Sequence, residues 1–269
     1  MSADYHVHTA FSGDSDTPME AMAETALKLK LSSLCFTEHM DLDFPGGDTS
    51  FHVDTQAYYK KYLSLQECFA EQIELQFGIE LGLQPQLAEI HTKYLRSWPF
   101  DFVIGSSHVV HHKDPYYPDY YDGRTEREAY LEYFESILEN LYAFSEMDVY
   151  GHIDYVVRYG PNKNKAYSYS AYQEVLDEIL RTLIDKGIGL EMNMGGFKYG
   201  LGHPNPTEEI LKRYRELGGE LITVGSDAHR PCDLAYDFHK VRELLSEAGF
   251  SYYTVFRKRK PYFLPLETF

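Results

Sequence analysis

The sequence predicts an α/β protein whose parallel strands close into a barrel, with its chemistry gathered at the carboxyl ends of the strands. Short apolar runs alternate seven times with longer segments of helical spacing, which is typical of strands joined by helical crossovers. Two of the runs are almost continuously apolar, as expected of a sheet covered by helices. Histidines and carboxylates stand within or just after the runs, and in barrels that end of the strands forms the active-site face. A doubly wound open sheet is the competing architecture.

The strands are expected at the apolar runs, and the helices at segments of helical periodicity between them. The runs are residues 5–8, 34–37, 75–81, 102–107, 149–153, 188–193 and 221–226. The helical segments are residues 17–30, 125–144, 170–187, 207–219 and 234–250. Thr17 is expected to be the N-cap of the first helix with Pro18 in its first position, and Gly187 to end the third.

Two connections are long enough to line the mouth of the barrel. Residues 108–125 are rich in tyrosine and proline, and residues 40–56 are similar in kind. No linker divides the chain, so we expect a single catalytic domain over residues 1–269.

Composition and charge exclude several classes of protein. The 269 residues carry a formal net charge of -17, whereas a protein that binds the nucleic-acid backbone normally has an excess of Lys and Arg. No stretch approaches the roughly 20 apolar residues of a membrane helix, and the N-terminus lacks the features of a secretory signal. Three widely spaced cysteines, Cys35, Cys68 and Cys232, suit a reducing compartment. We therefore expect a cytoplasmic protein with a small anionic substrate, no membrane contact and no long nucleic acid.

The first strand carries two histidines, His6 and His8, two residues apart. That spacing places both imidazoles on one face of a strand, and in a barrel this face can be the interior. A pair of imidazoles is costly there unless it binds something. The alternative is an edge strand with solvated histidines.

Glu80 stands within the third apolar run, beside Ile79 and Leu81. A carboxylate in such a setting is either paired with a basic side chain or bound to a cation. A buried salt bridge to Arg or Lys is the simpler explanation, and this motif alone leaves both open.

The motifs gain their meaning from occurring together. Six of the twelve histidines fall at strand ends, accompanied by two carboxylates; the set is His6, His8, His39, His108, His152, His229, Glu80 and Asp227. Nitrogen and carboxylate ligands without thiolates suit Zn, Mn or Fe, and this many ligands exceed what one ion needs. The sequence therefore predicts two to three divalent ions bridged by a carboxylate.

The chain resembles the PHP (polymerase and histidinol phosphatase) superfamily in the ordered motifs HxH, TEH, GIE, SSH, GHID and GSDAH. The resemblance runs from His6 to His229, and the length of the chain and an arginine after GHID are most similar to stand-alone histidinol-phosphate phosphatases. It implies a distorted (β/α)7 barrel with a trinuclear metal centre at the carboxyl ends of the strands. It also implies hydrolysis of L-histidinol phosphate, in histidine biosynthesis, by a hydroxide that bridges two ions.

The resemblance also implies which side chains hold each ion. The first ion would be held by His6, His8, Glu80 and Asp227. Glu80 would bridge to a second ion, which is completed by His108 and His152. The third would be held by Asp14, His39 and His229. Many relatives carry histidine at position 14, so the aspartate there is a departure that favours a harder ion. Glu191 and Asn193, on one face of the sixth strand, are expected to orient ligands.

Basic side chains near the strand ends are candidates for binding the phosphate. Arg158 can donate two parallel hydrogen bonds to a phosphate, which makes it the leading candidate for a catalytic clamp; a surface ion pair is the alternative. Weaker candidates for the same role are Lys198, His203 and Arg230. The leaving alkoxide needs a proton, which Asp154 or a histidine such as His229 could supply through a water.

Two other functions stay open. One is a nuclease or nucleotide phosphatase of the same superfamily, although the acidic charge argues against long polynucleotides. The other is a non-catalytic domain stabilised by metal. The full set of ligands argues against it, because a structural ion needs only one closed shell.

Overall fold

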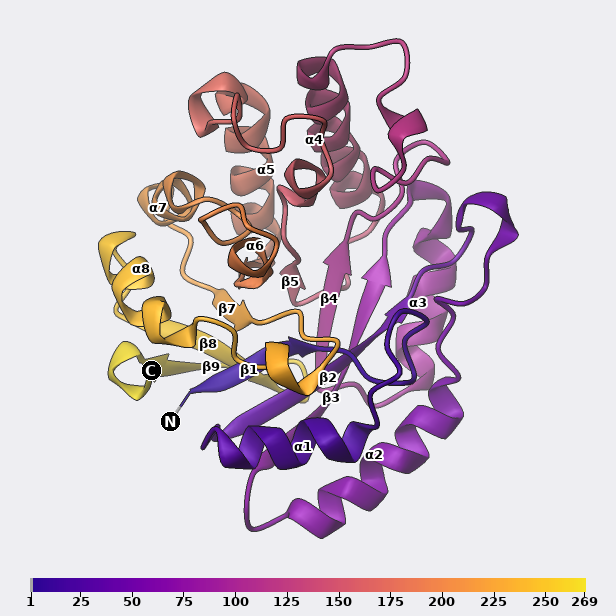
Figure 1. Ribbon diagram of the computed structural model, residues 1–269, viewed down its shortest axis with the longest axis vertical. Coiled ribbons are helices and arrows are strands. Elements are labelled where there is room, and N and C mark those ends of the chain that lie inside the picture. Colours follow the sequence, from indigo (N-terminus) through magenta and orange to yellow (C-terminus); the bar gives the residue numbers. More distant parts are fainter. Residues whose placement is uncertain (1) are drawn as a thin grey trace.

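A seven-stranded parallel sheet, rolled into a nearly closed barrel, dominates the computed structural model, which describes residues 2–269 (Figure 1). The strands are β1 (Ala3–Val7), β2 (Ser33–Met40), β3 (Glu74–Gly82), β4 (Phe102–Ser106), β5 (Val149–Tyr150), β6 (Gly189–Asn193) and β7 (Ile222–Gly225). They are hydrogen-bonded side by side in chain order, and each of them overlaps one of the seven predicted runs.

The two edges of the sheet meet through the segment that follows β7. Val7 of β1 forms a parallel bridge with Ala228. The N–H of His8 donates to the carbonyl of Ala228 at 2.9 Å, and the N–H of Asp227 donates to the carbonyl of His6 at 2.9 Å. Because these bonds join the first strand to the end of the last, the predicted barrel is confirmed and the open sheet is excluded.

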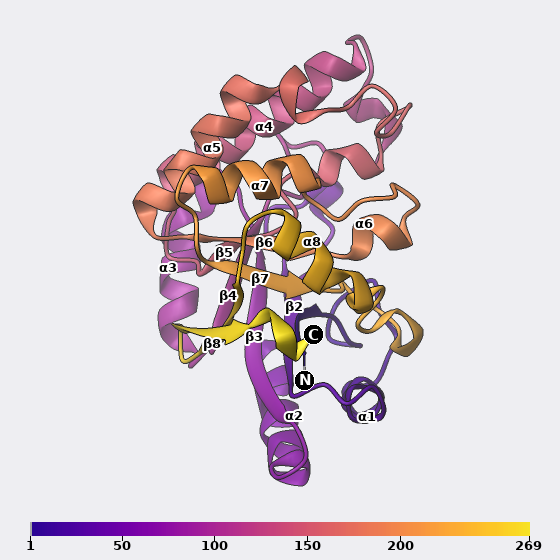
Figure 2. The same cartoon turned by 90° about the vertical axis from the view of Figure 1, so that its left-hand side faces the viewer.

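Helices cover the outside of the strands (Figure 2). They are α1 (Met19–Lys28), α2 (Thr55–Phe69), α3 (Ala88–Ser97), α4 (Glu126–Ala143), α5 (Gln173–Lys186), α6 (Gly195–Lys198), α7 (Glu208–Glu216) and α8 (Val241–Glu247). None of the helices in residues 2–269 has the length and apolar character needed to cross a bilayer.

The helix termini match the predictions in part. Gly187 ends α5 in the left-handed conformation, as predicted. Thr17 is not the N-cap of α1, because its hydroxyl donates to the carbonyl of His229 at 2.8 Å, and Pro18 occupies the cap position instead. The predicted helix over 234–250 is wrong in its first part, where Asp237 has a φ of 54° that a helix cannot contain.

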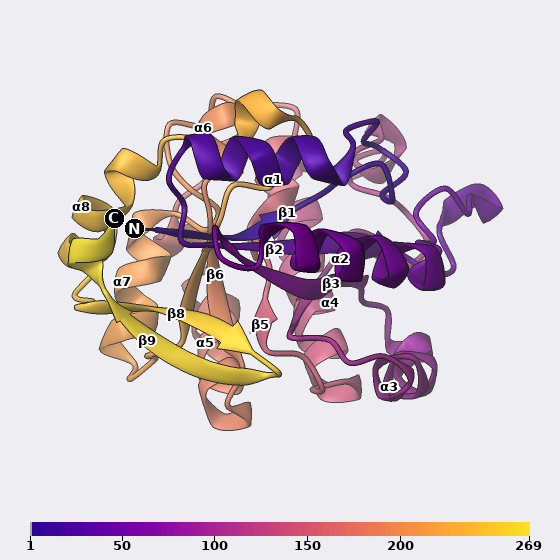
Figure 3. The ribbon, with the colours of Figure 1, turned by 90° about the horizontal axis from the view of Figure 1, so that it is seen from below.

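A hairpin that the sequence analysis did not identify closes the opposite end of the barrel (Figure 3). Its strands are β8 (Tyr252–Arg257) and β9 (Lys260–Pro265), which pair antiparallel. Arg257 donates to the carboxylate of Glu74 at the start of β3, and the N–H of Lys258 donates to Asp101 just before β4 at 3.0 Å. The amino ends of the strands are therefore covered, and the carboxyl ends are left for the site.

The lumen of the barrel holds polar side chains that are almost completely buried. His6 is 0% exposed and Glu80 and Glu191 are each 1% exposed. Gly225 of β7 makes room for them, because a Cβ atom at this position would lie 2.3 Å from the Cβ of His6. Charged groups held so deep need partners of opposite charge or a cation.

Candidate metal centre

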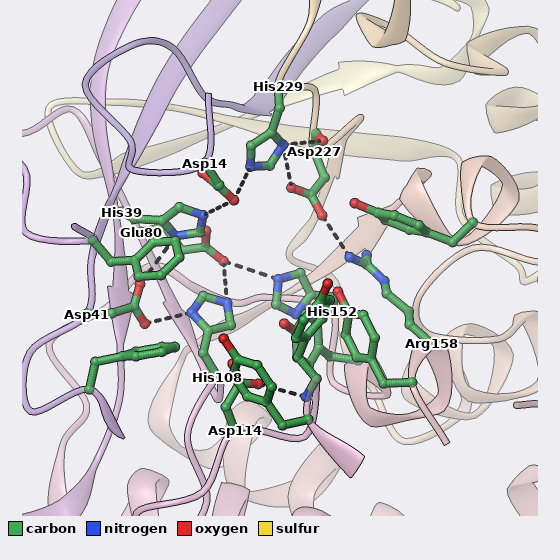
Figure 4. A pocket seen from close by; sticks show the side chains of 17 residues that line it. Asp14, His39, Asp41, Glu80, His108, Asp114, His152, Arg158, Asp227 and His229 are labelled. Atoms are coloured by element: carbon green, nitrogen blue, oxygen red, sulfur yellow. Dashed lines mark hydrogen bonds and ion pairs between the residues drawn. The ribbon is translucent and has the colours of Figure 1, made fainter. Parts of the chain in front are cut away.

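The nine side chains predicted as metal ligands lie in one cluster at the carboxyl ends of the strands, and Figure 4 shows those that line the cavity, among them Asp14, Glu80 and Asp227. Overlapping groups of three, each able to offer donor atoms within 4.8 Å of one another, include His6, His8 and Glu80; Glu80, His108 and His152; and His8, His39 and His229. The structure thus brings together residues that are up to 223 positions apart, as their places at the predicted strand ends implied.

Glu80 is the centre of the cluster because the β2–β3 register places it beside His39. Its Oε2 atom lies 3.1 Å from Nε2 of His6, 3.4 Å from Nε2 of His8 and 3.2 Å from Nδ1 of His39. None of these neighbours is Arg or Lys, so the simple buried salt bridge considered from the sequence is not what surrounds this carboxylate.

The other oxygen of Glu80 faces a different pair of imidazoles. Oε1 lies 3.3 Å from Nε2 of His108 and 3.1 Å from Nε2 of His152, and it also accepts a hydrogen bond from the hydroxyl of Ser106 at 2.7 Å. A carboxylate that presents one oxygen to each of two donor groups has the geometry of a bridging ligand. Although burial raises the pKa of the Glu80 carboxyl, the imidazoles of His6, His108 and His39 hold it well below its usual range.

Two further aspartates complete the cluster. Oδ1 of Asp227 lies 3.8 Å from Nε2 of His6 and 3.6 Å from Nε2 of His8. Oδ2 of Asp14 lies 3.0 Å from Nε2 of His229 and 3.6 Å from Nε2 of His39. Asp14, where the family pattern was weakest, therefore points at the same two histidines with which it was grouped.

Asp41 is a functional residue that the sequence analysis missed. Its carboxylate lies 2.7 Å from Nδ1 of His108 and 3.3 Å from Nδ1 of His39. Because a carboxylate only accepts, Nδ1 of His108 carries the proton of that bond, so Nε2, which faces Glu80, is the nitrogen left to bind a cation. The available signal was position, since Asp41 follows His39 by two residues and so shares its side of the extended chain.

Two other ligand candidates are held in the same way. Nδ1 of His6 lies 2.5 Å from Oε1 of Glu191, which was expected to orient metal ligands. Asn193 donates to Glu191 at 3.3 Å. Nδ1 of His8 lies 3.1 Å from the hydroxyl of Ser12. In each imidazole the second nitrogen is thereby turned toward the cluster.

The unpaired atoms of the cluster fit metal ions. Several buried polar atoms in it make no hydrogen bond, namely His8 Nε2, His39 Nδ1, Asp41 Oδ2, His152 Nδ1 and His229 Nε2. Leaving so many buried groups unsatisfied in one place is unfavourable, and cations would satisfy them. The donors are imidazole nitrogens and carboxylate oxygens without thiolates, which suit Zn, Mn or Fe.

Five of the imidazoles fall into two groups according to the direction in which their pKa is shifted. Burial lowers the pKa of His8 and His152, so both are neutral and offer a lone pair. For His6, His39 and His108 burial also lowers the pKa, but neighbouring carboxylates outweigh it, and for His108 they raise it to about 10. These three imidazoles would lose a proton on binding a cation.

Arg158 reaches the edge of the cluster and is held rigidly. Its side chain is 2% exposed and donates to Asn205 Oδ1 at 2.9 Å, Asp227 Oδ2 at 2.9 Å and Asn193 Oδ1 at 3.0 Å. A guanidinium has five N–H groups, so two remain, one on each terminal nitrogen. Arg158 also lines the cavity, which rules out the surface ion pair considered as an alternative.

The remaining predicted residues do not line the cavity. Asp154 is fully buried beside it, where it accepts hydrogen bonds from Asn205 Nδ2 at 2.5 Å and from the N–H of Thr207 at 3.1 Å. The three weaker phosphate candidates are engaged elsewhere: Lys198 with the carbonyl of Asp227, His203 with the carbonyl of Pro204, and Arg230, which is 70% exposed, with Asp233. A position just past a strand end was therefore not enough to place a side chain in the site.

The cavity above the cluster has a volume of about 370 Å³, which suits a small molecule. Its walls include Phe44 and Phe51 from the 40–56 connection and Asp114, Tyr116 and Tyr117 from the 108–125 connection. Both connections thus line the mouth of the site, as predicted.

Comparisons with known proteins identify the family that the chain matches. The model of the PHP domain family matches residues 4–195. The histidinol-phosphatase of Lactococcus lactis subsp. lactis (strain IL1403) is 34% identical over 251 residues, covering 92% of this chain and 91% of that protein. The histidinol-phosphatase of Bacillus subtilis (strain 168) is 25% identical over 269 residues, covering 89% of this chain and 98% of that one.

A solved structure resembles the whole fold. It is that of the Lactococcus lactis histidinol phosphate phosphatase complexed with Zn, L-histidinol and phosphate. It superimposes with a TM-score of 0.91 at 33% sequence identity, covering 97% of this chain and 98% of the other.

Proposed function

This chain belongs to the PHP domain family, and from that membership we propose that it is a metal-dependent phosphatase that hydrolyses L-histidinol phosphate to L-histidinol and phosphate. The observation that carries the proposal is a buried glutamate, Glu80, that presents its two oxygens to five imidazoles beneath a cavity of small-molecule size. The similarity to a phosphatase whose structure contains Zn, L-histidinol and phosphate supports the choice of substrate.

The cluster would hold two to three divalent ions, with zinc as the first candidate because the Lactococcus structure contains it. The proposed ligands are His6, His8, Glu80 and Asp227 for one ion; Glu80, His108 and His152 for a second; and Asp14, His39 and His229 for a third. Ions bound there would lower the pKa of a water and neutralise charge on the phosphate oxygens.

Arg158 is proposed to bind the phosphate. Its two free N–H groups lie on the two terminal nitrogens, which is the arrangement that pairs with two phosphate oxygens. Because Asp227, Asn193 and Asn205 already fix the guanidinium, little side-chain freedom remains to be lost when substrate binds.

The leaving alkoxide must receive a proton. Of the two groups considered from the sequence, His229 lines the cavity whereas Asp154 does not. Because His229 is also a proposed metal ligand and its Nδ1–H would be donated to the carbonyl of Asp227 at 3.1 Å, it would have no proton to give, so the proposal assigns the proton to a water in the cavity. The proposal gives Asp154 a positioning role, in which it holds Asn205 and through it Arg158.

A panel of phosphate esters tests the proposal. Zinc-reconstituted protein should hydrolyse L-histidinol phosphate with a kcat/KM at least on the order of 10²-fold above that for AMP or p-nitrophenyl phosphate. Equal turnover of the mononucleotide would instead favour a nucleotide phosphatase.

A matched pair of variants ties the activity to the cluster. Glu80→Gln removes the central charge and should abolish both metal retention and activity, whereas Glu89→Gln, at a 91% exposed position, should change neither. Activity retained by Glu80→Gln would contradict the proposed centre.

A further inference from the structure

Asp114 is a carboxylate of the cavity wall that stands apart from the metal cluster. It lies in the connection between β4 and α4, is 8% exposed and lines the cavity. Among residues 2–269, Tyr116 alone donates a hydrogen bond to it, from its backbone N–H to Oδ1 at 2.8 Å, and none forms an ion pair with it. Figure 4 shows it on the side of the cavity away from Asp14 and His229.

No basic side chain in residues 2–269 forms an ion pair with this carboxylate, and His108 acts on it only from a distance. Burial raises the pKa of Asp114 to about 6, the hydrogen bond from Tyr116 and the nearby His108 opposing that rise, so the group is still ionised at neutral pH. An ionised carboxylate in a nearly enclosed position is unfavourable unless a cation approaches it. The open side of Asp114 faces the cavity, so that cation would come from a bound molecule.

The wall beside Asp114 is made of aromatic rings. The rings of Tyr116 and Tyr159 meet edge to face at 5.3 Å, and those of Tyr159 and Tyr155 at 5.0 Å. All three line the cavity. Tyrosine faces attract cations, and a carboxylate next to such rings is a typical arrangement for binding an organic ammonium or imidazolium group.

We infer that Asp114, with the ring wall of Tyr116, Tyr155 and Tyr159, is a subsite for the positively charged part of the substrate. The inference rests on the proposed function, because L-histidinol phosphate carries an ammonium group and an imidazole in addition to its phosphate. The phosphate end would lie at Arg158 and the cluster, and the cationic end at Asp114. The subsite would thus select phosphate esters that carry a positive charge over neutral ones.

Asp114→Asn is the variant that tests the subsite. An asparagine keeps the size of the side chain, and its carbonyl oxygen can still accept the N–H of Tyr116, so the turn is preserved. Asp122→Asn is the matched control, because Asp122 is an exposed carboxylate of the same connection that does not line the cavity.

Four substrates separate the chemical groups. L-histidinol phosphate carries both candidate cations, O-phosphoethanolamine only the ammonium, 3-(imidazol-4-yl)propyl phosphate only the imidazole, and p-nitrophenyl phosphate neither. For Asp114→Asn we expect kcat/KM for L-histidinol phosphate to fall about 10- to 100-fold, mainly through KM, which is the usual effect of losing a hydrogen bond to a charged group. We expect a change below about twofold for p-nitrophenyl phosphate, and none from Asp122→Asn.

The pattern of losses identifies the cation or overturns the subsite. A loss shared with O-phosphoethanolamine assigns the ammonium, and a loss shared with the imidazole ester assigns the imidazolium. An equal loss for p-nitrophenyl phosphate, or an unchanged KM for L-histidinol phosphate, overturns the inference. If the unsubstituted protein shows no preference for L-histidinol phosphate, the proposed function fails instead. That outcome depends only on the kinetics of the unsubstituted protein, so it is distinguished from failure of the subsite.

Discussion

Replacing Asp41 by asparagine is expected to weaken metal binding without unfolding the barrel. Asp41 accepts the Nδ1–H of His108 at 2.7 Å and lies 3.3 Å from Nδ1 of His39. Asparagine has the same shape but no charge, and its amide can present an N–H in place of an acceptor. The two imidazoles would then lose the charged partner that directs Nε2 of His108 toward Glu80, and one of them would face an N–H in place of an acceptor.

The size of the effect follows from the pKa of Asp41. Burial raises that pKa, but His108 and His39 outweigh burial and hold it at about 2, below the usual 3.8. The difference between 3.8 and about 2 corresponds to about 2.4 kcal/mol in favour of the ionised carboxylate, or roughly 60-fold in an equilibrium constant. Loss of an outer partner of a metal-bound histidine typically lowers affinity by about 10- to 100-fold, which brackets the same value.

A zinc titration against a competing chelator measures the effect. Asp41→Asn should lose about 10- to 100-fold in the affinity of one site while the circular dichroism spectrum is unchanged. Asp43→Asn is the control, because Asp43 is an exposed residue of the same connection whose carboxylate accepts a hydrogen bond from Gln86 and lies outside the cluster. Parent-like zinc affinity in Asp41→Asn would refute the reasoning that Asp41 orients a ligand.

Three further predictions follow from the packing and charge of the centre. Gly225→Ala would push a Cβ against that of His6, so it should cost roughly 1–3 kcal/mol and lower the melting temperature; a parent-like melting curve and metal content would contradict this. Arg158→Lys keeps the charge but loses the planar fork, so kcat/KM for the phosphate ester should fall on the order of 10²-fold, and unchanged kinetics would remove Arg158 from the site. Burial lowers the pKa of His6, His39 and His108, but neighbouring carboxylates outweigh it, so these imidazoles are protonated at pH 7 in protein from which the metal has been removed. Zinc binding should therefore release protons, and the zinc affinity should increase from pH 6 to pH 9. Calorimetry in two buffers of different ionisation enthalpy measures the proton release.

The sequence was sufficient for the seven strands of the barrel and for most of the cluster, but not for the hairpin of β8 and β9. Alternation placed His6 and His8 on one face, and an isolated carboxylate in an apolar run marked Glu80. Both are local patterns that keep their meaning in any barrel, because side chains at strand ends converge on one face. The order of the motifs along the chain then indicated the remaining ligand candidates.

Residues whose roles depend on contacts between distant segments were harder to predict. Asp41 acquires its role only because β2 and β4 carry His39 and His108 toward it. Lys198 and Arg230 lie close to strand ends in the chain, yet Lys198 donates to the carbonyl of Asp227 and Arg230 forms an ion pair with Asp233. Spacing along one strand says which face a side chain occupies, but not which neighbour from another segment reaches it first.

The central claim is that activity requires more than one ion around Glu80, and stepwise reconstitution with zinc tests it most directly. Metal-free protein is titrated from zero to three equivalents while hydrolysis of L-histidinol phosphate is followed. The bridged geometry predicts little activity at one equivalent of zinc. Activity should then rise steeply as the second or third equivalent is added. Full activity at a single equivalent, or in the absence of bound metal, would contradict the account.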